Sequence, residues 1–274
     1  MTVASPPEGP PPLAAGDRLA PGYRVVTHLA RGRALDVYDV WSEERYALCV
    51  AKAPRPDRLH DPAVRRRLRN EGRLLLAMTH PHIVRAYELI ERPAPVLVLE
   101  ALTGATLGYV IDTRSGPLPA RELVFLGLQL CSAVRYLHAH RILHLDLKPA
   151  NVISEEGLVK LIDLSVARPP GRARPGVGTR QYLSPEQARG GVLSEAADVW
   201  GIGAVLYVAA TGKRAFAHLE EQERYPQLNA RAEPIRSRRR LPPALGQLID
   251  SCLEPETQDR PTPTEVFDSL ERLV

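Results

Sequence analysis

Residues 144–151 read HLDLKPAN, and they are the most informative segment of the chain. Asp146 lies two residues before Lys148, and Asn151 follows three residues later. A carboxylate can orient a hydroxyl group, an ammonium can neutralise a transferred phosphate, and an amide oxygen can bind a metal ion. The segment therefore has the side chains that phosphoryl transfer needs, and the flanking sequence must show whether a working site surrounds it.

The composition is that of an ordinary globular protein. The 274 residues are 44% hydrophobic and 25% charged, which suffices for one large core or two smaller lobes. The three cysteines lie far apart and form no CxxC pair, so we expect neither a zinc site nor disulfides, and a reducing cytoplasm as the location. We expect no signal peptide and no membrane span, because there is no basic and apolar leader and no apolar run of about 20 residues.

The charge pattern gives no sign of a nucleic-acid partner. The formal net charge is only +4, and the one arginine cluster, RSRRR at 236–240, contains no aromatic residue. Only four of the 36 basic residues are lysines, at positions 52, 148, 160 and 213. Because an ammonium is compact and a guanidinium is planar, each of these lysines is a candidate for a specific role.

The order of the predicted elements indicates two lobes. Residues 1–21 hold six of the 26 prolines and are expected to be a flexible tail. The stretches YRVVTHLA, DVYDVW, YALCVAKA and VLVLE then have the composition of strands. Long apolar helices follow, so we predict an α+β fold in residues 22–274, with an antiparallel-sheet lobe over about 22–102 and a mainly helical lobe over about 103–274.

One helix of the first lobe aims a carboxylate inward. Asp61-Pro62 is a helix start signal, and apolar residues recur at helical spacing to about Met78. Glu71 falls on the same stripe. From periodicity alone two interpretations stay open: the carboxylate pairs with Lys52 on the preceding strand, or it lies at the edge of the stripe and reaches water.

Several segments stand in the order and spacing typical of one family. Besides HLDLKPAN they are IDLSVA (162–167), GTRQYLSPE (178–186), DVWGIG (198–203) and DRPT (259–262). On these motifs, residues 22–274 resemble the eukaryotic-type Ser/Thr protein kinases of bacteria. A lysine two residues after the aspartate is typical of Ser/Thr rather than Tyr kinases.

The resemblance implies a role for each polar residue of these motifs. Asp146 would accept or orient the proton of the substrate hydroxyl, Lys148 would neutralise the γ-phosphate, and Asn151 with Asp163 would hold Mg²⁺ or Mn²⁺. Lys52 would bind the α- and β-phosphates of ATP, held in place by Glu71. The remaining implied roles are a substrate platform at Thr179 and Glu186, and structural contacts by Asp198 with the catalytic-loop backbone and by Arg260 with Glu186.

The same comparison implies an ATP site. Its adenine slot would be walled by apolar side chains, its hinge would be the backbone from Glu100 to Leu102, and Gly32 would belong to its glycine loop. Plain core packing explains the apolar residues equally well. The walls would be Leu29, Val37, Val50, Leu99 and Ile153.

The sequence departs from the family pattern in three places. The glycine loop, LARGRALDV, keeps only Gly32, with Ala30 and Leu35 at the other glycine positions, so we expect a looser or reshaped phosphate cradle. The DFG segment is DLS. Leu145 replaces the arginine that gathers the activation-loop phosphate, and no serine, threonine or tyrosine lies between Ser165 and Gly178. The phosphate acceptor and its receptor are thus missing together.

The sequence therefore predicts a cytoplasmic Ser/Thr protein kinase that uses ATP and a divalent metal ion to phosphorylate proteins. A pseudokinase that binds nucleotide or a partner without transfer is the main alternative, because the glycine loop is degenerate. A small-molecule phosphotransferase of the aminoglycoside type is the third. Thr179, the SPE segment and Arg260 argue against it, because they build a platform for protein substrates.

Overall fold

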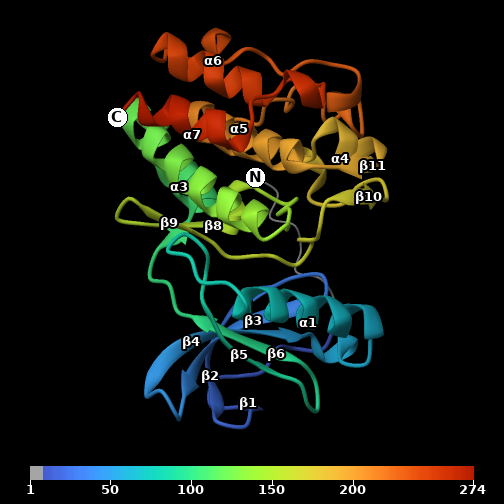
Figure 1. The fold of residues 1–274 in the computed structure, drawn as a ribbon. Helices are drawn as coiled ribbons and strands as arrows, with labels where there is room; N and C mark the ends of the chain where they lie inside the picture. The colour runs from blue at the N-terminus through green and yellow to red at the C-terminus, as the bar shows by residue number, and fades with distance from the viewer. Residues whose placement is uncertain (1–8) are drawn as a thin grey trace. The chain divides into compact units, whose positions relative to one another are not determined.

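The structure is a computed structural model that describes residues 9–274. It divides into two compact units: one comprises the chain up to Thr79 together with Val84–Leu102, and the other comprises His80–Ile83 and Thr103–Val274. The first unit holds an antiparallel sheet and one long helix, whereas the second is mainly helical (Figure 1). The predicted α+β fold, with strands first and helices after, is confirmed.

The sheet of the first unit has six strands in the order β1-β2-β3-β4-β6-β5. Alternation along the strands separates two faces. Tyr38 and Val40 on β3 contribute to the buried core of this unit, whereas Val37 lies on the opposite face and is paired in register with Lys52 on β4. The strands are β1 (Arg18–Ala20), β2 (Tyr23–Arg31), β3 (Leu35–Ser42), β4 (Ala47–Pro54), β5 (Ala86–Ile90) and β6 (Val96–Glu100).

Helix α1 (Pro62–Leu76) begins where the sequence predicts. Asp61 is the N-cap, and its carboxylate accepts hydrogen bonds from the backbone N–H groups of Ala63 (2.9 Å) and Val64 (3.3 Å). Leu68, Glu71 and Leu75 on its inner face are buried. The helix ends two residues before the predicted Met78, at a C-cap formed by Ala77.

The predicted flexible tail is wrong for part of its length. Residues 1–8 lie outside the described residues, but Arg18–Ala20 form β1, which pairs with β2. Ala20 is 7% exposed within the core, and Leu13 packs against that core. The prediction was based on the proline content and gave too little weight to these few apolar side chains. Their burial offsets the conformational entropy that is lost when the segment becomes ordered.

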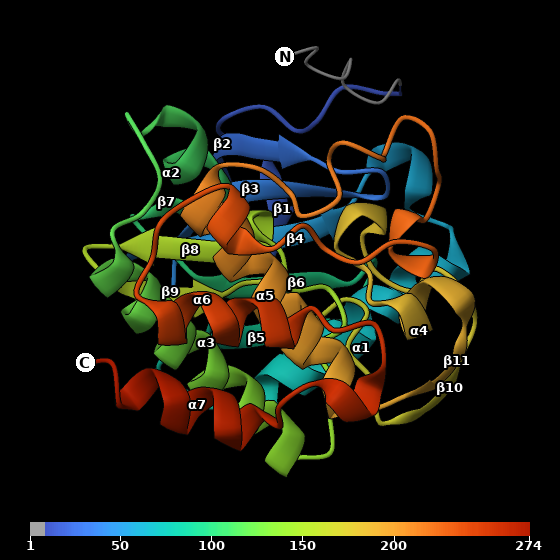
Figure 2. The same cartoon turned by 90° about the horizontal axis from the view of Figure 1, so that it is seen from above.

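The second unit is organised around α5 (Glu195–Thr211), which is buried along almost its whole length. Helices α3 (Ala120–Ala139), α6 (Pro243–Cys252) and α7 (Pro263–Glu271) pack against it, and α3 lies beside α7 (Figure 2). The remaining α-helices and β-strands are α2 (Leu107–Thr113), α4 (Pro185–Arg189), β7 (Ala105–Thr106), β8 (Val152–Glu155), β9 (Leu158–Leu161), β10 (Gly171–Ala173) and β11 (Gly191–Leu193).

Residues 80–83 belong to this second unit for a visible reason. The Leu161 N–H donates to the His82 carbonyl (3.0 Å), and the His82 Nδ1 lies 2.9 Å from the Val159 carbonyl oxygen, so both bonds tie the segment to β9. No helix within residues 9–274 combines the length and apolarity needed to cross a membrane.

Candidate active site

In the first unit, the inward carboxylate of α1 meets the rare lysine of β4. The Lys52 Nζ donates to the Glu71 Oε1 at 2.6 Å, and the Glu71 side chain is fully buried while that of Lys52 is 12% exposed. Of the two interpretations left open by periodicity, the ion pair is the one observed. The pair holds the ammonium on the sheet face that also carries Val37.

In the second unit, the HLDLKPAN segment folds so that its polar side chains converge. The Lys148 Nζ donates to the Asp146 Oδ2 (2.8 Å) and to the Thr179 Oγ1 (2.6 Å). The Asn151 Nδ2 donates to the Asp146 carbonyl oxygen (2.9 Å) and to the Asp146 Oδ2 (3.1 Å). Four residues that the sequence singled out, from two segments about 30 residues apart, therefore form one connected cluster.

This cluster leaves two oxygens available for chemistry. The Asp146 Oδ1 is buried and has no hydrogen-bond partner among the described residues, which is costly unless a ligand supplies a donor. Because both Asn151 amide bonds come from Nδ2, its Oδ1 is the atom that can face a cation. The Asp146 Oδ1 can therefore accept a hydrogen bond from a bound ligand.

Asn151 and Asp163 are brought close by the backbone. Ile162, which precedes Asp163, donates its N–H to the Asn151 carbonyl oxygen at 3.1 Å. An amide oxygen and a carboxylate are hard oxygen donors that suit Mg²⁺, which also takes oxygens from phosphate and water. No group of three His, Cys, Asp or Glu side chains able to hold a metal occurs within residues 9–274.

Asp198 binds the backbone that directly precedes Asp146. Its Oδ1 accepts the Leu145 N–H (2.7 Å), and its Oδ2 accepts the His144 N–H (2.8 Å) and lies 2.8 Å from the His138 Nε2. Burial alone would raise the pKa of Asp198, but the hydrogen bonds from His138 and the Leu145 N–H hold it below its ordinary value. Leu145, with φ of +64°, is thereby held in the left-handed region.

Arg260 anchors the predicted substrate platform through Glu186. The two side chains form a bidentate pair, with Nη1–Oε1 at 2.7 Å and Nη2–Oε2 at 2.9 Å. The remaining guanidinium bonds go to the carbonyl oxygens of Glu254, Pro255 and Ala196, and the guanidinium lies over the Trp200 ring. The pairing of Arg260 with Glu186 that the resemblance implies is present in the structure.

The degenerate glycine loop forms a tight hairpin turn between β2 and β3. The Gly32 N–H donates to the Leu35 carbonyl oxygen at 2.8 Å, and neither Ala30 nor Leu35 has a positive φ. A backbone in this conformation accepts ordinary L-residues, so losing two glycines has not distorted the hairpin.

Two polar side chains that sequence reasoning missed hold this hairpin. Asp36 is fully buried and accepts from the Arg31 Nε (2.9 Å) and Nη2 (3.1 Å). Arg55, 2% exposed, donates to the carbonyl oxygens of Gly32 (3.3 Å) and Arg33 (3.4 Å). The sequence did contain a signal for Asp36. In a strand alternate residues point to the same face, so Asp36 points to the core side together with Tyr38 and Val40. The position of Glu71 on the inner face of its helix was predicted by the same kind of argument.

The residues predicted to enclose adenine lie in both units. In the first unit, Val50 on β4 and Leu99 on β6 are direct partners in the sheet, with Leu99 2% exposed and Leu29 on β2 48% exposed. In the predicted hinge, the Glu100 N–H donates a hydrogen bond to the Arg85 carbonyl oxygen (2.9 Å). The Leu102 N–H makes no hydrogen bond to the described residues. Ile153 lies on β8 of the second unit.

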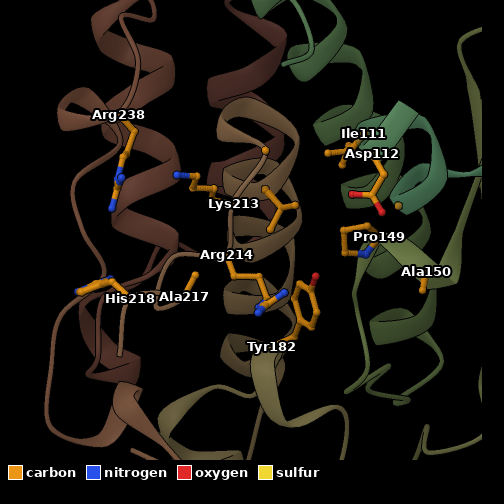
Figure 3. Close-up of a pocket in the computed structure, with 13 residues that line it drawn as sticks. Ile111, Asp112, Pro149, Ala150, Tyr182, Lys213, Arg214, Ala217, His218 and Arg238 are labelled. Atoms are coloured by element: carbon orange, nitrogen blue, oxygen red, sulfur yellow. The ribbon is translucent and has the colours of Figure 1, made fainter. Parts of the chain in front are cut away.

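A pocket of about 710 Å³ adjoins the catalytic loop within the second unit. It is lined on one side by Asp112 and by Pro149 and Ala150, which directly follow Lys148, and on the other by Lys213 and Tyr182 (Figure 3). Asp112 and Lys213 are both exposed, so the pocket presents a carboxylate and an ammonium beside the Pro149–Ala150 segment.

Comparison with known proteins assigns this arrangement to a family. Residues 23–270 match the family model described as the protein kinase domain. The chain belongs to the protein kinase family. Among curated proteins it is similar to the serine/threonine-protein kinase PknB of Mycobacterium leprae, 35% identical over 213 residues, which is 73% of this chain and 32% of that protein.

Other bacterial protein kinases match to a similar extent. The serine/threonine-protein kinase PrkC of Bacillus subtilis is 31% identical over 211 residues, covering 73% of this chain and 32% of that protein. The chain therefore matches about a third of the length of these relatives. The predicted resemblance to bacterial Ser/Thr protein kinases is confirmed.

Proposed function

We propose that the chain is a Ser/Thr protein kinase that transfers the γ-phosphate of ATP to hydroxyl groups of proteins. The observation that carries the proposal is the cluster of Asp146, Lys148, Asn151 and Thr179, with the buried Asp146 Oδ1 lacking a donor. In this proposal that oxygen accepts the hydrogen bond of the incoming substrate hydroxyl and takes up its proton.

The chain's own groups then divide the work of the transfer. The substrate oxygen forms a bond to the γ-phosphorus while the bond from that phosphorus to the β,γ-bridging oxygen breaks, leaving ADP. Lys148, held between Asp146 and Thr179, neutralises charge on the phosphoryl group. Lys52, held by Glu71, binds the α- and β-phosphates. Asn151 and Asp163 would hold Mg²⁺ or Mn²⁺, and the bound ion would supply neutralisation of phosphate charge.

The substrate protein is proposed to lie along the second unit, beside the pocket next to Pro149 and Ala150. That position brings a flanking segment of the substrate near Thr179 while its hydroxyl reaches Asp146. A cytoplasmic location is also proposed, supported by three buried cysteines that are all free thiols.

The test is transfer of radiolabelled phosphate from ATP to a generic protein acceptor, followed by phosphoamino-acid analysis. Asp146→Asn should lower transfer by about 10²-fold or more, the range for loss of a positioned general base. Asp268→Asn, at an exposed position on α7, is the matched control and should match the parent. Magnesium-dependent nucleotide binding without transfer to any protein, in parent and variants alike, would replace this proposal by the pseudokinase alternative.

A further inference from the structure

The activation segment is defined here as residues 164–185. No serine, threonine or tyrosine lies between Ser165 and Gly178, and Leu145 stands where an arginine would bind such a phosphate. The segment must nevertheless be held, because Thr179 near its end bonds to Lys148 at 2.6 Å. Some other contact must therefore position it.

Main-chain pairing holds the outer part of the segment. Strand β10 pairs with β11 in antiparallel register, Gly171 opposite Leu193 and Ala173 opposite Gly191. Closer to the catalytic loop, Leu143 and Arg168 exchange two backbone hydrogen bonds of 2.8 and 3.1 Å. Strands β10 and β11 lie together beside α4 in both views (Figures 1 and 2). Within residues 174–179, the part nearest the catalytic loop, the Gly176 N–H donates to the Gln187 carbonyl oxygen at 2.8 Å.

The buried side-chain amide of the same residue adds further hydrogen bonds to that inner part. Gln187 is 3% exposed, and its Nε2 donates to the Leu145 carbonyl oxygen and to the Val177 carbonyl oxygen, each at 2.8 Å. Its Oε1 accepts from the Ser184 N–H and hydroxyl, each at 3.1 Å. Both amide hydrogens and the amide oxygen are therefore used, and they join the catalytic loop, the activation segment and the start of α4.

The two carbonyls that Gln187 binds flank the reacting groups. Leu145 directly precedes Asp146, and Val177 lies two residues before Thr179. Gly178, which lies between Val177 and Thr179, has a φ of +115°. A Cβ at this position would lie 2.5 Å from the Leu145 carbonyl oxygen, so the backbone of the activation segment is in close contact with that of the catalytic loop. The Gln187 amide thus fixes the distance that Lys148 spans between Asp146 and Thr179.

We propose that Gln187 is a positioning residue that holds the activation segment against the catalytic loop without phosphorylation. The inference rests on the proposed kinase function and adds how the site is kept assembled. Phosphatase treatment of the parent should leave its activity unchanged, since the hydrogen bonds of Gln187 to Leu145 and Val177 need no phosphate.

The sharpest test is Gln187→Glu. The introduced carboxylate is nearly isosteric and still accepts from the Ser184 N–H, so the cap of α4 is kept, but it cannot donate to either carbonyl oxygen. We expect kcat to fall by about tenfold or more, because misplacement by about 1 Å can cost up to ~10²-fold. KM for ATP should stay within about twofold. Gln181→Glu, at an exposed position in the same segment, is the matched control and should behave as the parent.

Amide hydrogen exchange supplies a readout that does not depend on activity. The Gly176 amide, which donates to the Gln187 carbonyl oxygen at 2.8 Å, should be protected in the parent and in Gln181→Glu. It should exchange faster in Gln187→Glu, while the helices outside α4 keep their protection. Parental kcat and protection in Gln187→Glu, or loss of parental activity on dephosphorylation, would overturn the inference. If the parent transfers no phosphate, the proposed function fails, and the exchange pattern alone then decides the role of Gln187.

Discussion

Replacing Asp198 should damage both stability and activity, because this carboxylate holds a strained backbone. The residue is 1% exposed and accepts the N–H groups of His144 and Leu145 at 2.8 and 2.7 Å. Asp198→Ala leaves two buried N–H groups without an acceptor, and each such loss costs about 1–3 kcal/mol. The Leu145 φ of +64° then also loses the bond that maintains it.

Together these terms predict a loss of about 3–5 kcal/mol in the free energy of unfolding, allowing for partial relaxation. That is a large part of the total stability of a typical protein, about 5–15 kcal/mol. Asp198→Asn should lose less stability, because its amide oxygen can still accept a backbone N–H group. Its NH₂ group would face another N–H group and could not accept a hydrogen bond from it. Its kcat should still fall, because Leu145 directly precedes Asp146.

The assay combines urea unfolding with steady-state phosphate transfer at a temperature where each variant is folded. Asp268→Ala, exposed on α7, serves as the control for loss of a carboxylate as such. If Asp198→Ala unfolds within about 1 kcal/mol of the parent and keeps its kcat, the carboxylate does not maintain the catalytic loop, and the reasoning is refuted.

Three further predictions follow from contacts in the two units. Lys52→Met should abolish useful transfer and destabilise the first unit by up to about 3–5 kcal/mol by leaving Glu71 buried alone; unchanged activity and thermal unfolding would exclude the pair from both roles. Ala30→Gly combined with Leu35→Gly should lower KM for ATP more than it changes kcat in steady-state kinetics, and an unchanged KM would contradict the effect assigned to the missing glycines. Burial holds the pKa of His80 below its ordinary value of about 6.5, so its contribution to stability is complete above that pH and is lost as the pH falls. His80→Gln should therefore reduce the loss of unfolding free energy between about pH 7.5 and about pH 5.5, and an undiminished loss would assign it to other groups.

Much of this protein could be predicted because the signals are local. Asp61-Pro62 marks a helix start in any context, and the position of Glu71 on the inner stripe follows from 3.6 residues per turn. HLDLKPAN places Asp146, Lys148 and Asn151 within six residues, so chain connectivity alone keeps them together. These signals also carried the family resemblance that the comparisons confirm.

The prediction was wrong where a high proline content outweighed a few apolar residues. The proline-rich N-terminal segment was expected to be flexible, yet Arg18–Ala20 pair with β2. This strand is stabilised by hydrogen bonds to the backbone N–H and carbonyl groups at the edge of the sheet, and that edge exists only once the sheet has folded. Asp36 shows the converse, since its inward position was visible from alternation but its partners Arg31 and His28 lie on a neighbouring strand.

The sequence by itself determined which side chains point to the inner face of their own helix or strand, and which chemical groups the catalytic loop contains. Tertiary structure decided which distant groups those side chains meet. Gln187 reaches carbonyl oxygens 42 and 10 residues away, and Arg260 pairs with Glu186 across 74 residues. Periodicity reports only the direction of a side chain from its own backbone, whereas a hydrogen-bond partner is set by how helices and loops pack once the core has formed.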